Sequence, residues 1–353
     1  DLGLFNNRVN FLVDYFIRDI YDKLADQRIP ISTGFSSVKI NNGTLQNRGI
    51  EIEANFKVIN TDDIKWNIGA NFTRVRNLVK KLPDNGNDKN SIGGQEIWDP
   101  SDPTKTMYVG GRQQGERVGD DLVVGYQDEG VYHNQAELDP HKDRQIQFYA
   151  GTIPTANRKP MVGDTRWKDV NGDGIIDSRD RVVLGRTTPD FIGGFTTDFT
   201  YKNINLFIKT DYAVGHLVHN GVRSRGISQV QGNMNWTSEI KDTWTPENPN
   251  ADIPRYDFTD PRGNHKAGGE GQFTASSRYW EKGDYLALRE ITLSYNLPGA
   301  AVNNAFKDIR LFVSGTNLAY FTKYSGYSPE KGGWDNGRFP LPRSFTFGIN
   351  ATF

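Results

Sequence analysis

The stretch Phe345–Phe353 reads FTFGINATF, and its side chains alternate between apolar and polar from one residue to the next. The apolar positions are Phe345, Phe347, Ile349, Ala351 and Phe353, and the polar positions are Thr346, Asn350 and Thr352. Successive side chains of a β-strand point to opposite faces, so this period of two predicts a strand with one apolar and one polar face.

The same two-residue period recurs in eight other segments, whereas a helical period is rare. These segments are Asp1–Phe5, Val9–Ile17, Ile50–Val58, Trp66–Phe72, Phe195–Tyr201, Ile204–Tyr212, Ile291–Leu297 and Ile309–Val313. The chain is therefore predicted to be all-β, with about nine antiparallel strands.

The connections between these segments alternate between short and long. Tight turns such as Lys202-Asn203 contrast with links at roughly 20–45, 82–190, 215–280 and 323–343 that are rich in Gly, Pro, Asn and Asp. Short turns at one end and long loops at the other, on strands with an apolar face, are typical of a transmembrane β-barrel. A water-soluble β-sandwich also alternates, but its loops are usually similar at both ends, so it is the second interpretation.

Composition excludes some classes of protein. The 353 residues carry a formal net charge of -1, which does not favour nucleic-acid binding, and the absence of cysteine excludes a disulfide framework. The sequence lacks an apolar run of about 18 residues that would form a transmembrane helix. It opens at Asp1 without a signal peptide, so we expect it to be the interior of a longer protein.

Four blocks of sequence carry a family resemblance. They are DTWTPENPNADIPRY (242–256), YLALREITLSYNLP (285–298), GTNLAYFTKYSGYSPE (315–330) and RFPLPRSFTFGINATF (338–353). They resemble the closing segments of SusC-like TonB-dependent transporters of the SusC/RagA family of Bacteroidetes, and the aromatic Phe353 is similar to the terminal assembly signal of outer-membrane barrels.

The resemblance implies a protein of the bacterial outer membrane that is not an enzyme. It would import oligosaccharides or peptides with a SusD-like surface lipoprotein, powered through TonB. The family has a barrel of about 22 strands around a plug domain, preceded by a TonB box. Nine strands cannot close that barrel and neither plug nor box is present, so residues 1–353 are expected to be its C-terminal part, with a long extracellular loop at about 82–190.

The segment DVNGDGIIDSRD, residues 169–180, has the residue spacing of an EF-hand-type calcium loop. Its predicted oxygen ligands are the side chains of Asp169, Asn171, Asp173, Asp177 and Asp180 and the carbonyl of Ile175. Gly174 stands where the loop needs a sharp turn. Calcium is the cofactor that we expect, held outside the membrane as a structural element.

Five tryptophans in or beside the long links are candidate substrate contacts, because sugar rings stack on aromatic side chains. They are Trp98, Trp236, Trp244, Trp280 and Trp334. Two other functions stay open: a passive porin, and a secreted calcium-binding β-protein with a dockerin-like loop. The sequence does not identify the substrate.

Overall fold

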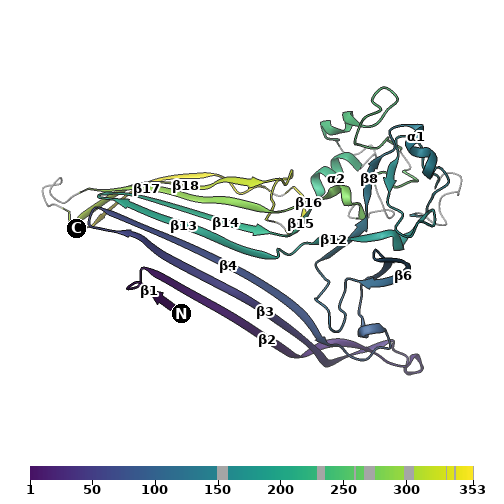
Figure 1. Cartoon of the computed structure of the whole chain (residues 1–353), viewed down its shortest axis with the longest axis horizontal. Coiled ribbons are helices and arrows are strands. Elements are labelled where there is room, and N and C mark those ends of the chain that lie inside the picture. The colour runs from purple at the N-terminus through teal and green to yellow at the C-terminus, as the bar shows by residue number, and fades with distance from the viewer. Residues whose placement is uncertain are drawn as a thin grey trace.

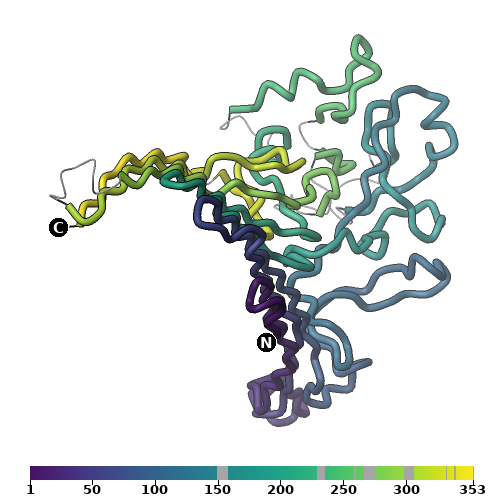
Figure 2. The backbone as a smooth tube through the Cα atoms, turned by 60° about the vertical axis from the view of Figure 1, so that its left-hand side comes forward, coloured from purple at the N-terminus to yellow at the C-terminus, as the bar shows by residue number. Residues whose placement is uncertain are grey.

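The computed structural model describes residues 1–148, 158–228, 235–257, 260–265, 275–297, 306–330, 332–337 and 339–352. A long curved sheet forms one part of the molecule, and shorter elements gather at one end of it (Figure 1). Figure 2 shows the sheet nearly edge-on as a bent wall, with the shorter elements on one side. Phe353 lies outside the described residues.

Nine antiparallel strands form the sheet, in the order β1-β2-β3-β4-β13-β14-β17-β18-β20. Their bounds are β1 Leu2–Leu4, β2 Val9–Arg28, β3 Ser37–Asn60, β4 Ile64–Lys81, β13 Phe191–Tyr201, β14 Ile204–Val214, β17 Tyr285–Leu297, β18 Asp308–Thr322 and β20 Ser344–Thr352. Each contains or overlaps one of the nine predicted segments, and sequence neighbours are also neighbours in space. The all-β prediction with a large antiparallel sheet is confirmed.

The predicted long link at 20–45 is wrong. β2 continues to Arg28 and β3 already starts at Ser37, so only 29–36 connect them, including the short η1 helix Ile31–Thr33. Two irregularities in the register, between Ile20 and Leu24, interrupt the strict alternation there, which explains why the sequence pattern fades.

The register places most of the large apolar side chains of neighbouring strands on one face. Leu206 lies opposite Phe199 and Leu293, and Leu293 lies opposite Val313, which faces Phe347 on β20. Many of these side chains are exposed, and Phe347 is 79% exposed. The other face carries polar residues such as Asn205, Ser294 and Asn350. An exposed apolar face on a polar-lined sheet is the arrangement of a barrel wall in lipid.

The shorter elements lie in three links, at 82–190, 215–284 and 323–343, which together we call the cap. Its strands are β5 Gln95–Asp99, β6 Asp102–Val109, β7 Leu122–Tyr126, β8 Asp128–Val131, β9 Gln145–Ile146, β10 Thr165–Trp167, β11 Ile175–Ile176, β12 Arg181–Arg186, β15 Leu217–Asn220, β16 Trp280–Lys282 and β19 Gly333–Asp335. Its helices are α1 Gln135–Leu138, α2 Gly221–Ser228 and the 3-10 turns η2 Asp88–Asn90, η3 Asp139–His141, η5 Ser178–Asp180, η6 Ser238–Asp242 and η8 Ser277–Tyr279. None of the described helices is long and apolar enough to cross a membrane.

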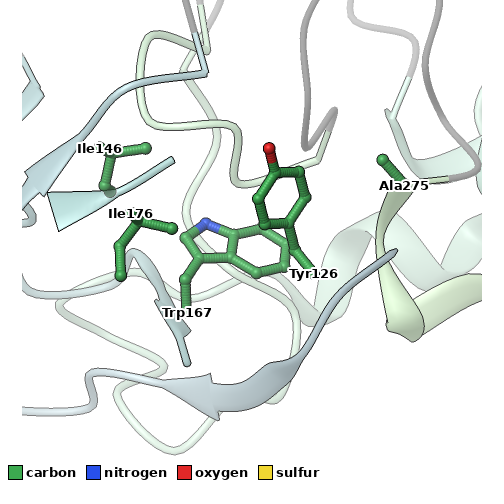
Figure 3. Close-up of a cluster of buried hydrophobic side chains, with 5 residues drawn as sticks. All are labelled: Tyr126, Ile146, Trp167, Ile176 and Ala275. Atoms are coloured by element: carbon green, nitrogen blue, oxygen red, sulfur yellow. The ribbon is translucent and has the colours of Figure 1, made fainter. Parts of the chain in front are cut away.

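The cap has a conventional buried core. Tyr126, Ile146, Trp167, Ile176 and Ala275 form its main cluster, with the Trp167 indole beside the Tyr126 ring (Figure 3). The two ring centroids are 6.2 Å apart. Because four of these residues come from β7, β9, β10 and β11 and Ala275 comes from the second link, the core ties the first link to the second.

Candidate functional site

The predicted calcium loop is a compact turn whose side chains bond to its own backbone. The carboxylate of Asp169 accepts hydrogen bonds from the Gly172 and Gly174 N–H groups, at 2.8 and 3.0 Å. Asp173 Oδ1 accepts from the Ile175 N–H at 2.7 Å. Gly174 has φ 81°, a left-handed conformation that favours glycine. These bonds fold the segment into a tight turn in which Asp180 is buried, Asp169 and Asp177 are partly buried and Asp173 is exposed.

The carbonyl of Ile175 takes no part in the pairing of β11 with β9. β11 pairs with β9 in parallel, and the Gly174 and Ile176 carbonyls accept the bonds from Gln145 and Gln147 at 2.8 Å each. Alternate carbonyls of a strand point in opposite directions. The Ile175 carbonyl therefore points away from β9.

Asp180 is the most enclosed acidic group of the loop. Its carboxylate is fully buried and accepts hydrogen bonds from the Val170 and Asp177 N–H groups at 2.9 and 2.8 Å. Burial raises the pKa of the Asp180 carboxyl to about 6, from an ordinary value of 3.8. A buried carboxylate whose charge is disfavoured is a group that a divalent cation would stabilise.

Other contacts in the loop oppose a ready-made site. Asn171 donates to Asp173 Oδ2 at 2.8 Å, and Arg179 forms a salt bridge with Asp177 at 2.9 Å. Within the described ranges, no three histidine or acidic side chains are arranged as a metal cage. The donor set is the hard-oxygen set that calcium prefers, so the residues fit the ion in kind, and the calcium assignment stays a prediction.

A second candidate site is a polar cavity of about 770 Å³ in the cap. Its wall contains the ion pair between Arg223 of α2 and Glu239 of η6, with the Arg223 Nη2 atom 2.6 Å from Glu239 Oε1. Glu281, also in the wall, accepts hydrogen bonds from Asn220 Nδ2 at 3.1 Å and from Ser325 Oγ at 2.8 Å. Both charge signs and several hydroxyl and amide groups meet there, which suits a ligand rich in hydrogen-bonding groups.

Two of the five predicted tryptophans, Trp236 and Trp280, directly precede residues that line this cavity. Trp280 and Trp334 belong to β16 and β19, which flank β15, and their rings lie 5.2 and 4.6 Å from the ring of His219. Trp236 packs on Tyr256 at 5.2 Å and precedes Thr237 of the cavity wall. Trp236 and Trp334 are 47% exposed, so they can offer a ring face to a ligand.

The other two tryptophans have structural contacts elsewhere. The guanidinium of Arg179, a residue of the predicted calcium loop, lies over the Trp98 ring, with Cζ 4.5 Å from the ring centre. Trp244 donates from Nε1 to the His133 carbonyl at 3.3 Å. Trp236 and Trp280 thus neighbour residues that line the cavity, Trp334 packs with Trp280 around His219, and Trp98 and Trp244 have contacts elsewhere. None of the five is itself among the described residues that line the cavity, so their role as substrate contacts stays a prediction.

The charged residues of the cavity wall were not predicted from the sequence. Arg223, Glu239 and Glu281 come from three elements separated by 16 and 42 positions, and no motif joins them. Only the packing of α2, η6 and β16 brings them together.

Comparison with known proteins gives relatives over the whole chain. A TonB-dependent receptor of Formosa agariphila is 30% identical over 374 residues, which cover 100% of this chain and 33% of that protein. A second receptor of the same organism is 30% identical over 370 residues, covering 100% and 34%. The TonB-dependent receptor SusC of Bacteroides thetaiotaomicron is 25% identical over 360 residues, covering 100% and 31%. No family model matches the chain.

The fold also matches solved structures. A chain in the structure of the RagAB peptide transporter aligns with a TM-score of 0.66 and 22% identity, covering 99% of this chain and 34% of that one. The chain thus spans about one third of the length of its relatives. These matches confirm the resemblance to SusC-like TonB-dependent transporters that the sequence blocks carry. The curated relatives are receptors rather than enzymes.

Proposed function

We propose, from the similarity of the whole chain to SusC-like TonB-dependent receptors, that it forms part of the barrel and extracellular face of an outer-membrane importer. The observation that carries this proposal is the two-faced sheet. Its apolar face carries exposed side chains from one edge of the sheet to the other, for example Val13, Phe195 and Phe347, and all three links of the cap lie at the same end of it.

The remaining strands, the plug and the TonB box belong, on this proposal, to the part of the transporter that this chain does not cover. β1 and β20 form the two edges of the sheet in the described residues. An unpaired edge in lipid costs several kcal/mol for each unsatisfied backbone group, so both edges need neighbouring strands.

The proposed substrate is an oligosaccharide or a peptide, taken up with a SusD-like surface lipoprotein and with energy supplied through TonB. The cavity lined by Arg223, Glu239 and Glu281 has a volume of about 770 Å³ and polar walls, which supports a substrate rich in hydrogen-bonding groups. The RagAB match is a peptide transporter, and the SusC match shares the receptor class.

Uptake measurements test this function. Cells that express the whole transporter should accumulate labelled oligosaccharide or peptide, and loss of TonB should abolish the accumulation. Glu281→Gln should weaken uptake, whereas Asp62→Ala, in the short turn at the far end of the sheet, should leave it unchanged. Uptake that persists without TonB would show a passive porin.

We also propose that residues 169–180 bind calcium as a structural element of the cap. Asp169, Asn171, Asp173, Asp177 and Asp180 would supply side-chain oxygens and Ile175 its carbonyl. The buried Asp180 carboxylate supports this assignment, and the Ile175 carbonyl is left out of the pairing with β9.

Calcium titration of the whole transporter, followed by hydrogen exchange in 169–180, tests the site. Added calcium should protect the loop, and Asp173→Ala should remove that protection while the sheet stays folded. The exposed Asp62→Ala variant is the matched control, because it removes one carboxylate far from the loop. Equal protection with and without calcium would refute the site.

A further inference from the structure

Three arginines cluster on the apolar face of the sheet, where that face meets the cap. The register places Arg48 of β3 opposite Ile17 of β2 and Arg76 of β4, and Arg74 opposite Ile50. No register shift lies between these arginines and the neighbouring apolar residues Ile50 and Phe72. Arg48, Arg74 and Arg76 therefore project from the same face as Phe72 and Ile50.

A row of aromatic side chains on the same face indicates the depth of these arginines in the membrane. Phe72, the residue two before Arg74, contacts Phe191 with ring centres 5.6 Å apart, and Phe195 stacks on Tyr212 at 5.5 Å. Aromatic rows of this kind flank the apolar band of membrane barrels at the interface. The arginines follow directly after this row, on the side of the cap, so they lie at headgroup depth.

The cluster has a surplus of positive charge. In the described part of the three strands, the acidic partner on this side is Asp19, which is bound to Lys80 at 2.9 Å and to Gln46 at 2.8 Å. Among the described residues, no salt bridge involves Arg48, Arg74 or Arg76, and the buried Arg74 Nε has no hydrogen-bond partner. Cross-strand neighbours lie about 5 Å apart at Cβ, and like charges at that distance repel.

The segment that runs beside β4 adds to this positive field. The Glu116 carbonyl accepts from the Val79 N–H at 2.9 Å, and Arg117 follows it. Burial, the Arg186 charge and the Arg76 charge lower the pKa of Arg117. Arg117 and Arg186 are balanced by Asp121 and Asp190, so these acids do not neutralise the cluster on the strands.

We propose that Arg48, Arg74 and Arg76 bind the phosphate-bearing headgroup of an anionic lipid in the outer leaflet. A guanidinium holds phosphate through two parallel hydrogen bonds, and basic pockets at the membrane surface attract anionic headgroups. An anion between Arg48 and Arg76 removes their repulsion. The inference rests on the proposed placement of the sheet in the outer membrane.

The position of the cluster favours a lipid over a soluble anion. The apolar face continues without a break from the arginines to Ile50, Ile52 and Phe72, so a headgroup on the arginines places its acyl chains along these side chains. A free phosphate would gain only the charge interaction.

The test uses the whole transporter extracted in a neutral detergent and titrated with phosphatidylglycerol or phosphatidylcholine, with bound lipid counted by native mass spectrometry. The wild type should bind the anionic lipid preferentially. Arg48→Gln/Arg76→Gln should weaken that binding roughly ten- to thirtyfold, since each basic group contributes about one kcal/mol of attraction. Lys65→Gln is the matched control, because Lys65 is a cation of the same β4 strand on its other face and at its far end.

Each outcome decides the inference. Equal binding of the two lipids, unchanged binding by the double variant, or displacement of the lipid by inorganic phosphate alone would overturn it. Should the double variant not assemble, the salt dependence of wild-type binding decides, because binding through arginine charges must weaken as salt rises. Absence of the wild-type protein from the outer membrane would instead refute the proposed function.

Discussion

The sheet and the cap bury opposite kinds of side chain. In the sheet, Phe347 and Leu293 are exposed, and polar Ser294 is buried on the inner face. In the cap, Trp167 and Ile176 are buried, as in a water-soluble domain. The contrast fits the proposed placement of the chain, because an exposed apolar surface is stable against lipid, whereas a buried apolar core is stable in water.

The cap also buries a network of paired charges. Asp164 of the cap is fully buried between Arg255, whose Nε lies 2.7 Å from its Oδ1, and Arg262, whose Nε lies 3.2 Å from its Oδ2. It also accepts from Asn264 Nδ2 at 2.8 Å. This network joins 163–166 to 255–264, segments that are distant in sequence.

The largest effect is expected from Asp164→Ala. Loss of this carboxylate leaves Arg262 buried without its closest acidic partner and should lower the free energy of unfolding of the cap by about 3 to 5 kcal/mol. Hydrogen exchange should show faster opening in 159–166 and 255–265, with the sheet unaffected. Equal loss of protection in β13 and β14 would show that cap and sheet unfold as one unit.

The next effect tests the sheet. Phe347→Lys places a charge on the apolar face at the level of Val313 and Leu293, and should cost about 2 to 4 kcal/mol in a membrane. Thr346→Lys, one residue earlier on the polar face, should cost far less. The amount of heat-modifiable folded protein in the outer membrane measures both. Equal tolerance of the two variants would favour a soluble β-sandwich.

A smaller effect is expected from pH in the calcium-free cap. The pKa of Asp180 is raised in the folded state to about 6, so the folded protein holds a proton that the unfolded chain releases at about 3.8. Protonated Asp180 therefore contributes fully to the stability of the cap below about pH 4. As the pH rises through about 6, this contribution is lost, and the free energy of unfolding of the cap falls by about 1 to 3 kcal/mol. Thermal unfolding of the cap at pH 4, 5 and 6, monitored by tryptophan fluorescence, measures this slope.

Asp180→Asn is the matched variant for this slope, because it keeps the shape without the titrating group. The variant should flatten the pH dependence, and calcium should restore stability to the wild type at pH 7 but not to the variant. A slope unchanged in the variant would assign the titration to another group.

The smallest effect is expected at the surface of the cap. Lys105 and Asp102 form an ion pair at 2.6 Å with 74% and 38% of their side chains exposed. Lys105→Gln should change the free energy of unfolding by less than about 1 kcal/mol, because solvent screens the pair. Chemical denaturation of the two proteins measures the difference. A loss as large as that of Asp164→Ala would contradict the distinction between buried and exposed charges.

The sequence by itself determined the strands and their faces. The period of two at Phe345–Thr352 and at Ile204–Tyr212 shows which side chains share a face, and the alternation is a property of each strand, so the local pattern suffices. The oxygen spacing at Asp169–Asp180 is equally local, and the structure shows the turn that it encodes.

Only the tertiary structure decided which distant residues meet. Asp164 meets Arg255 and Arg262, and Arg223 meets Glu239 beside Glu281, through contacts that no period or motif records. The arginines Arg48 and Arg76 are adjacent because the register of β3 and β4 sets them opposite each other. These pairs form because many small contacts between distant segments together determine how the segments pack. The two faces of a strand, in contrast, follow from the local geometry of the backbone.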